Sequence, residues 1–371
     1  MAFLLNGLGA VLPPLQKELR VSRGEVAFYP SLFAAGLVVV GLVGGPLVTR
    51  MGRVAALRLA ITGLLLGGLL IAAPVRVVTL LGALLLGLAA ALLIQLVPAV
   101  LAAHQPQAST ARIGEANALA SAASVLAPLA VSVSLAIGLG WRAGYLAVPL
   151  LALAAITLPA WRLALLDPSN TLNQSQPAAP APMLGRWVDL VFAVSVEFCF
   201  VFWAASAFIA WDHASLSQAP ALASLFLVGM ATARGLSVHI IRRISNPRML
   251  MLVCAGVAAA GFALFWTAPT LSLAAAGLLL AGLGVALLYP TTVSRVVAAW
   301  PQAQDKAAAR AALGSGLAIG GAPFLLAQLS DGVGLRMAFL IVPALLLVLG
   351  VRVATSGAGR VESLSSAKAE S

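Results

Sequence analysis

One acidic side chain lies in the middle of a long apolar stretch, where a carboxyl group is costly to place. Glu197 is flanked by Val194-Ser195-Val196 and Phe198-Cys199-Phe200, and the nearest preceding cation, Arg186, is 11 residues away. A carboxyl in such a place is expected to bind and release a proton as its access to water changes. The alternative is a structural carboxyl that stays protonated or pairs with Arg234, which lies roughly two turns inside another apolar stretch.

Several uncharged side chains in the apolar stretches could contact a solute: Asn6, Gln95, Asn117, Trp203 and Tyr289. Amide and phenol groups donate and accept hydrogen bonds, and aromatic rings offer a flat stacking face, so together they suit a hydroxyl-rich ligand. The competing interpretation is hydrogen bonding between helices, which polar side chains also provide. For Asn117 the residues alone favour that packing role.

The pattern predicts no enzyme, no cofactor and no metal site. The apolar stretches hold no nucleophile beside a base, no paired carboxylates and no cluster of metal ligands. Gly7-Leu8-Gly9 and Gly282-Leu283-Gly284 lack the third glycine of a dinucleotide-binding loop. Cys199 and Cys254 both fall within apolar stretches, so we expect no disulfide.

The composition identifies the elements that must position these residues. Of the 371 residues, 61% are hydrophobic and only 9% are charged, with a mean hydropathy of +1.04. Soluble domains are about 45–50% apolar and about 25% charged, so a soluble globular protein is excluded. A helix needs about 20 apolar residues to cross a bilayer. Twelve such stretches predict an all-α membrane protein: 1–16, 27–48, 54–73, 77–102, 113–138, 142–162, 188–211, 220–241, 249–268, 271–298, 308–330 and 336–353. The first is short for a crossing; either the true start lies upstream or this helix is brief.

The cations predict the orientation of these spans. The net charge of +11 comes from 22 Lys and Arg residues that are scattered singly, which argues against nucleic acid as a partner. If both termini are cytoplasmic, 16 of the 22 fall in inner segments, as the positive-inside rule requires. We therefore expect a multi-pass protein of the cytoplasmic (inner) membrane. The outer segments then hold Lys17, Arg20, Arg23, Arg76, Arg142 and Arg336.

The chain divides into two related halves. The segment Gly140–Pro149 resembles Gly334–Pro343 at an offset of 194 residues, and the same offset pairs Gln95 with Tyr289. Six spans in each half place the two repeats parallel to one another. The predicted parts are an N-terminal bundle over 1–166, a proline-containing cytoplasmic linker over 167–187, a C-terminal bundle over 188–354 and a disordered cytoplasmic tail over 355–371.

The loop between the second and third spans carries a known motif. Gly45-Pro46-Leu47-Val48-Thr49-Arg50-Met51-Gly52-Arg53 resembles the G-x-L-x-D-R-x-G-R signature of the major facilitator superfamily. The resemblance implies the major facilitator fold, with twelve helices in two pseudo-symmetric bundles and a cavity lined by spans 1, 4, 7 and 10. It assigns cytoplasmic gating to Gly45, Arg50, Gly52 and Arg53. Thr49 stands where the family has an acid, so this latch is expected to be weak.

Shorter motifs are similar to the fucose-permease-like branch of sugar porters. Glu197…Trp203 resembles part of that branch's seventh span, Asn117 lies in a stretch similar to its asparagine-bearing helix, and Gly282-Leu283-Gly284…Tyr289-Pro290 is similar to its tenth span. This resemblance implies that the solute is a sugar. It also strengthens the case for Asn117 as a ligand.

The sequence thus predicts a secondary active transporter that moves a small polar solute, with sugars favoured, by alternating access coupled to protons through Glu197. Its partners would be the solute, protons and the lipid bilayer, and we expect a monomer. Two alternatives stay open. One is a proton-driven efflux pump for amphipathic compounds, suggested by the aromatic seventh span. The other is a non-transporting membrane sensor or lipid-handling protein.

Overall fold

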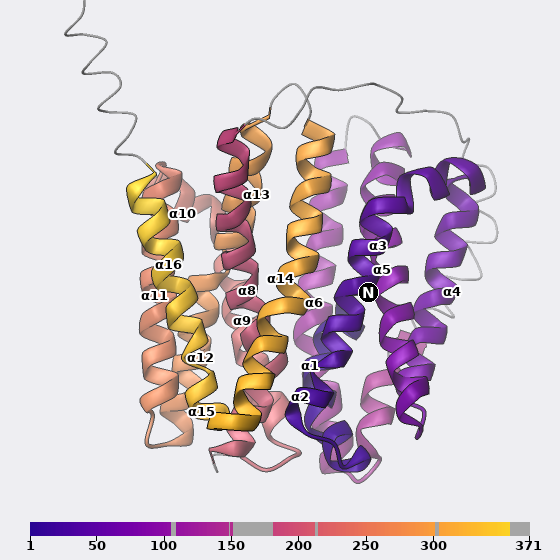
Figure 1. Ribbon diagram of the computed structural model, residues 1–371, viewed down its shortest axis with the longest axis vertical. Helices are drawn as coiled ribbons and strands as arrows, with labels where there is room; N and C mark the ends of the chain where they lie inside the picture. The colour runs from indigo at the N-terminus through magenta and orange to yellow at the C-terminus, as the bar shows by residue number, and fades with distance from the viewer. Residues whose placement is uncertain (105–108, 148, 151–180, 212–213, 301–303, 357–371) are drawn as a thin grey trace, which may run out of the picture.

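The computed structural model describes residues 1–104, 109–147, 149–150, 181–211, 214–300 and 304–356, with a few side chains in these ranges left out. Within them the regular structure is helical, and the long helices run side by side (Figure 1). The chain is therefore an all-α protein in the part that the structure describes.

The first half of the chain contributes α1 to α6. The bounds are α1 Ala2–Leu19, α2 Arg23–Val26, α3 Phe28–Met51, α4 Arg53–Ile71, α5 Arg76–His104 and α6 Ser109–Ala136. Residues 140–147 are also helical, but most of the predicted sixth span lies outside the described residues. Figure 1 draws these helices, in indigo to magenta, on one side of the molecule.

The second half contributes the remaining helices, which occupy the other side in Figure 1. Their bounds are α8 Ala181–Ala210, α9 Ala219–Gly235, α10 Ser237–Arg243, α11 Pro247–Thr267, α12 Leu271–Val285, α13 Leu288–Ala298, α14 Gln304–Val333, α15 Leu335–Ala338 and α16 Ile341–Thr355. The helix α8 begins at Ala181, so it includes the last residues of the predicted linker. The rest of that linker and residues 357–371 of the predicted tail lie outside the described part.

The membrane spans agree in large part with the apolar stretches. Nine helical segments of the described chain are long and apolar enough to cross a bilayer, or ten if α9 and α10 form one bent span. The first predicted span, α1, is not among them; it has 18 residues with Pro13 and Pro14 inside, and it starts about halfway up the bundle in Figure 1. The predicted count of twelve is therefore confirmed only in part.

Two predicted spans are broken. The eighth bends by 61° between α9 and α10, so it ends at Gly235 and α10 turns away with no buried residue. The tenth is interrupted at Ala286–Leu287, between α12 and α13. Proline at position 290 accounts for the second break, because it has no N–H to donate to the carbonyl of Ala286 four residues earlier.

The repeat is visible in backbone geometry. Gly140 and Gly334, which the 194-residue offset pairs, have φ angles of 75° and 82°. Positive φ of this kind is open to glycine and strained for other residues. In both halves a glycine with positive φ therefore precedes the last span.

The two halves are in contact near one end of the bundle, the end that carries α2 and α15 in Figure 1. There the Gly24 N–H donates to Asp331 Oδ2 over 2.9 Å, and Gln328 Nε2 donates to the Gly24 carbonyl over 3.1 Å. Further along, α3 packs on α14 at Gly320, where an added Cβ would lie 2.8 Å from that of Ala34. We call this the α2–α15 end and the opposite one the α10 end.

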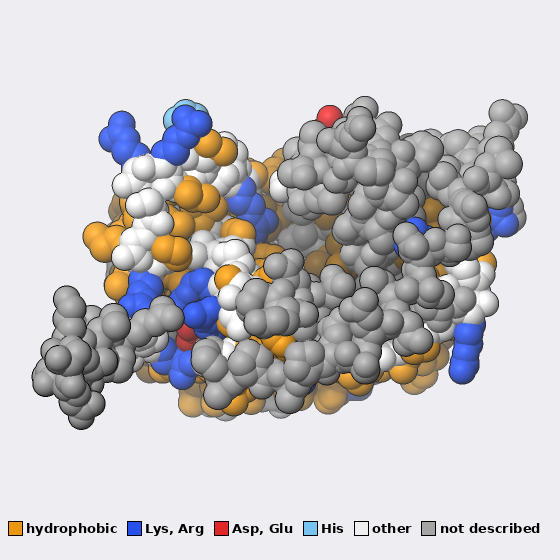
Figure 2. Space-filling view, turned by 90° about the horizontal axis from the view of Figure 1, so that it is seen from above, with side chains coloured by type: hydrophobic (Ala, Val, Ile, Leu, Met, Phe, Trp, Pro, Cys, Tyr) orange, Lys and Arg blue, Asp and Glu red, His pale blue; other side chains and the backbone are white. Residues whose placement is uncertain are grey.

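The α10 end carries most of the cations in the part of the chain that the structure describes. The last turns of α3, α10, α13 and α16 hold Arg50, Arg242, Arg243, Arg295 and Arg352. Figure 2 looks onto this end and shows Lys and Arg side chains among grey, undescribed residues. This is the end that the positive-inside rule predicts to be cytoplasmic.

Candidate functional site

The structure brings Glu197 and Arg234 together in the middle of the C-terminal half, which is the pairing that the structural alternative for Glu197 predicts. Arg234, at the end of α9, places a guanidinium nitrogen 3.4 Å from Oε1 of Glu197 on α8. The side chain of Glu197 is 14% exposed and that of Arg234 is 37% exposed. The contact is single and long, so it holds the two groups in one place without the two parallel bonds that make the strongest Arg–carboxylate pairs.

Arg234 is positioned by the break in the tenth span. Its Nε donates to the carbonyl of Ala286 over 3.2 Å. That carbonyl has lost its helical donor to Pro290, and an unpaired carbonyl in the bilayer is costly. The same guanidinium therefore completes the broken helix and contacts Glu197, which ties α8, α9 and α12 to one another.

Tyr289 follows the same break and is 38% exposed. Its hydroxyl interacts with Ser315 of α14 by a hydrogen bond and with Glu197 and Arg234 electrostatically. These four side chains, Glu197, Arg234, Tyr289 and Ser315, form what we call the charged site. Ser315 was missed in the sequence because a serine in a helix rich in small residues gives no distinguishing signal.

The predicted solute contacts of the N-terminal half lie on other helices and are uncharged. Gln95 on α5 is exposed and its Nε2 donates to the Val40 carbonyl over 3.2 Å. It fits there because Gly44 has no side chain; a Cβ at that position would lie 2.6 Å from Gln95 Oε1. Asn6 on α1 donates to Ala2 O and to Ser124 Oγ, each over 3.0 Å.

For Asn6 this geometry matches the competing prediction, a hydrogen bond between helices, here α1 and α6. Asn117 lies in α6, but its side chain is outside the described part. Trp203 is fully buried, and its indole N–H donates to the Pro323 carbonyl over 3.0 Å. In this structure Trp203 thus packs α8 against α14 and faces no open space.

The aromatic side chains of α8 are also packed inside the C-terminal half. Phe200 stacks on Phe226 with ring centroids 4.9 Å apart and meets the edges of Phe262 and Phe265. Phe198 and Phe202 lie 5.5 Å apart, and both are buried. These rings hold the bundle together and do not form an open apolar surface.

The predicted gating motif forms the link between α3 and α4. Gly52 has a φ of 80° there, a conformation that favours glycine and lets two long helices meet with a single residue between them. Arg50 is exposed and Arg53 is half-buried. The side-chain surroundings of Gly45 and Thr49 are outside the described part.

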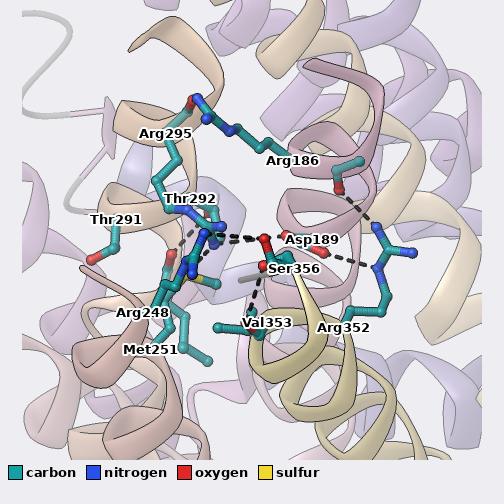
Figure 3. A network of polar contacts seen from close by, with 12 residues as sticks. Arg186, Asp189, Arg248, Met251, Thr291, Thr292, Arg295, Arg352, Val353 and Ser356 are labelled. Atoms are coloured by element: carbon teal, nitrogen blue, oxygen red, sulfur yellow. Dashed lines mark hydrogen bonds and ion pairs between the residues drawn. The ribbon is translucent and has the colours of Figure 1, made fainter. Parts of the chain in front are cut away.

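A second buried carboxylate, Asp189, was not singled out in the sequence. Figure 3 shows it on α8 facing arginines from other helices. Arg352 Nε of α16 donates to Asp189 Oδ1 over 2.9 Å, and Arg295 of α13 approaches Oδ2 to 3.7 Å. The Asp189 side chain is only 5% exposed, and its two contacts join α8, α13 and α16 at the α10 end. Asp189 lies at the edge of an apolar stretch, where charged residues are common, so its burial gave no signal.

Among the described residues, no three His, Cys, Asp or Glu side chains lie together as metal ligands would. The groups of the charged site offer two kinds of chemistry. Its carboxyl can exchange a proton, and its guanidinium, phenol and hydroxyl can hydrogen-bond a polar solute.

Comparison with known proteins places the chain in a family. The sequence profile of the Major Facilitator Superfamily matches residues 1–275. No curated protein sequence matches. Among solved structures, a bacterial homologue of the human lysosomal transporter Spinster is similar in two inward-facing structures. The unoccupied one has 15% identity and a TM-score of 0.68, and the occupied one 14% and 0.71; each comparison covers 95% of this chain and 94% of that one.

A variant of the E. coli fucose:proton symporter FucP is also similar, with 17% identity and a TM-score of 0.59. That comparison covers 95% of this chain and 97% of the symporter. At such identities the likeness concerns the fold. It agrees with the fold that the loop motif at 45–53 predicts.

Proposed function

The chain belongs to the major facilitator superfamily, and we propose that it is a secondary transporter that moves a small polar solute by alternating access, coupled to protons through Glu197. The observation that carries this proposal is the contact between Glu197 and Arg234 beside the broken tenth span. Buried, ionisable groups within spans are seldom packing alone. The protein has the transporter fold of its family, and the solute and the coupling are the proposed parts.

The proposed coupling follows from the two acceptors that share Arg234, the Glu197 carboxylate and the Ala286 carbonyl. When Glu197 is ionised, its carboxylate holds the guanidinium over 3.4 Å. When Glu197 takes up a proton, that attraction is lost. Arg234 then keeps its hydrogen bond to the Ala286 carbonyl, and its terminal N–H groups are free to bind another acceptor. Proton binding at Glu197 therefore makes Arg234 available to a solute, and solute binding at Arg234 favours the protonated carboxyl.

Sugars remain the favoured class of solute. Tyr289 and Gln95 are exposed side chains at repeat-related positions of α13 and α5, and both offer donors and acceptors for hydroxyl groups. We propose that the solute lies between these two side chains and that Arg234 contacts it from the C-terminal half. Asn117 stays a candidate ligand by its resemblance to the sugar-porter helix.

Access from the two sides would alternate as the halves rock. We propose that the α10 end is cytoplasmic, with both termini there, and that the protein lies in the inner membrane. The contacts of Gly24 with Asp331 and Gln328 then close the outer side. The motif Gly45, Arg50, Gly52 and Arg53 would act at the cytoplasmic side, where Arg50 is exposed at the end of α3.

The efflux alternative rests on one observation, the few polar side chains that the described residues of the N-terminal half contribute. Its other support, the aromatic seventh span, is weakened because Phe200 and its neighbours pack on one another within the C-terminal half. For a sensor or lipid-handling role, the described residues add no specific observation.

The experiment is uptake of labelled sugars into proteoliposomes that hold the purified protein. An inward proton gradient should drive accumulation above the outside concentration, and a protonophore should abolish it. Accumulation of no sugar or related polyol, together with proton-driven export of amphipathic dyes, would replace this proposal with the efflux pump.

A further inference from the structure

The α2–α15 end holds a second place where charged groups gather, separate from the charged site. A cavity of about 420 Å³ lies there between α1 and α8. Its wall carries three cations, Lys17, Arg20 and Arg23, together with Gln16 and Ser206. The apolar remainder is Pro13, Val21, Ile209 and Leu216.

Local structure explains why the three cations converge. Gln16, Lys17 and Arg20 lie on one face of the last turns of α1, since side chains three and four residues apart are neighbours on a helix. Arg20 then takes a left-handed conformation with φ 53°, which ends α1 and turns the chain toward Arg23 at the start of α2. The loop thus folds its cations around one space.

The other cations at this end already have partners. Arg76 pairs with Glu25 over 2.8 Å, Arg142 pairs with Glu18, and Arg336 donates to the Trp266 carbonyl and stacks on its ring. In the described part of the chain, Lys17, Arg20 and Arg23 have no acidic partner, and the cavity wall has no carboxylate. Three unpaired cations on one wall raise the local concentration of anions.

The opposite wall supplies a polar group that also has no partner. Ser206 of α8 is 5% exposed, and its Oγ is buried without a hydrogen-bond partner in the described structure. A buried hydroxyl without a partner is uncommon and calls for an explanation. A ligand oxygen in the cavity would accept a hydrogen bond from the Ser206 hydroxyl on one side and from the arginine N–H groups on the other.

We infer that this cavity binds an anionic oxygen group, a phosphate or a carboxylate, carried on an apolar body. The anion meets Lys17, Arg20, Arg23 and Ser206, and the apolar part lies along Ile209 and Leu216. Since α1 belongs to one half and α8 to the other, the bound group bridges the halves where they are in contact. It therefore favours the state in which this end is closed. The inference concerns binding and holds whether or not Glu197 couples protons.

The test is calorimetric titration of the purified protein with octyl phosphate, with inorganic phosphate as competitor and chloride at equal ionic strength as control. Saturable binding is expected, and the double substitution Arg20→Gln with Arg23→Gln should weaken it by about tenfold or more. Ser206→Ala, which leaves every charge in place, should weaken it by roughly threefold. The matched control is Arg76→Gln, a cation at the same end that already has a partner, and it should bind as the parent does.

Two vesicle compositions separate the sources of the anion. If phosphatidylglycerol in phosphatidylcholine vesicles competes with phosphate in the parent but not in the double variant, the group is a lipid headgroup. If the lipid has no effect while phosphate still competes, the group belongs to a soluble solute. Equal affinity in the parent, the double variant and Ser206→Ala would overturn the inference. So would an equal loss in Arg76→Gln, because binding would then follow surface charge alone.

Discussion

The two halves of this transporter carry different chemistry at positions that the repeat makes equivalent. At the offset that pairs Gln95 with Tyr289, Glu197 corresponds to Phe3 and Arg234 to Val40. Phe3 is buried, and Val40 offers only its backbone carbonyl to Gln95. The N-terminal half thus has an amide where the C-terminal half has a carboxyl, a guanidinium and a phenol. In our account the C-terminal half couples protons and the N-terminal half only contacts the solute.

The largest loss of uptake is expected from Arg234→Gln, which removes the charge that the equivalent position of the N-terminal half, Val40, also lacks. Glu197 loses its cation and the Ala286 carbonyl loses its donor. Without that cation the solute loses its donors and Glu197 no longer links proton binding to solute binding, so the initial rate of uptake should fall by about 100-fold, which corresponds to roughly 2.7 kcal/mol in the barrier. The exposed Arg242→Gln on α10 is the matched control and should leave the rate unchanged. If Arg234→Gln keeps more than half of the parent's uptake rate, Arg234 does not link Glu197 to the solute.

The next largest effect is on solute affinity, and two variants test whether the solute contacts both halves. Tyr289→Phe and Gln95→Leu each remove hydrogen-bonding groups from exposed side chains at equivalent positions. Each should weaken solute affinity by about tenfold, which is the loss of one or two hydrogen bonds. Affinity is measured as the half-saturating concentration in solute exchange without a proton gradient. If only Tyr289→Phe has an effect, the solute contacts one half and the proposed position is wrong.

A smaller effect, on stability, separates a buried pair from an exposed one. Asp189→Asn leaves Arg352 and Arg295 without their carboxylate, and we expect the free energy of unfolding in detergent to fall by about 2 kcal/mol. The control in the other half is Glu25→Gln. Its pair with Arg76 is solvent-exposed on both sides and should contribute less than about 1 kcal/mol. Equal losses of unfolding free energy in Asp189→Asn and Glu25→Gln would show that burial does not make the Asp189 contacts more stabilising than the exposed pair.

The smallest effect is the dependence of stability on pH at the end of α1. The Arg142 guanidinium hydrogen-bonds Glu18, beyond the predicted first span, and holds the pKa of that carboxyl below its usual value. The stabilisation is therefore present above the usual carboxyl pKa, about 4.3, and is lost as the pH falls through the lower folded value. Because both side chains are 36% exposed, we expect at most about 1 kcal/mol, reduced further by 1 M salt. Unfolding midpoints of the parent and Glu18→Gln should converge at acid pH; a constant difference from pH 7 to pH 3 argues against this pair.

Much of the fold could be predicted from the sequence because lipid imposes long apolar helices. The stretches at 54–73, 249–268 and 336–353 begin and end within two residues of the observed spans. The positive φ at Gly52 agrees with a glycine in a tight loop between helices. The bend after Gly235 could not be predicted, since 220–241 is continuously apolar enough for one span and the bend depends on what α9 packs against.

The candidate site could be predicted only in outline. Glu197 and Arg234 stand out because charge is rare within the spans, and their pairing was one of two interpretations. The role of Pro290 in freeing the Ala286 carbonyl could also have been found, because the loss of a helical donor follows from the residue type. The contacts of Asp189 could not, since Arg295 and Arg352 reach it from helices more than a hundred residues away. For Trp203, burial against Pro323 depends on the packing of α8 on α14.

The central claim, that protons are coupled through Glu197, is tested most directly by one comparison in proteoliposomes. The parent and Glu197→Gln are each assayed for accumulation of the solute under an inward proton gradient and for exchange of labelled against unlabelled solute without a gradient. Our account predicts that Glu197→Gln loses accumulation and retains exchange, because the amide keeps the shape of the site but cannot release a proton. A Glu197→Gln variant that concentrates the solute as the parent does would contradict it.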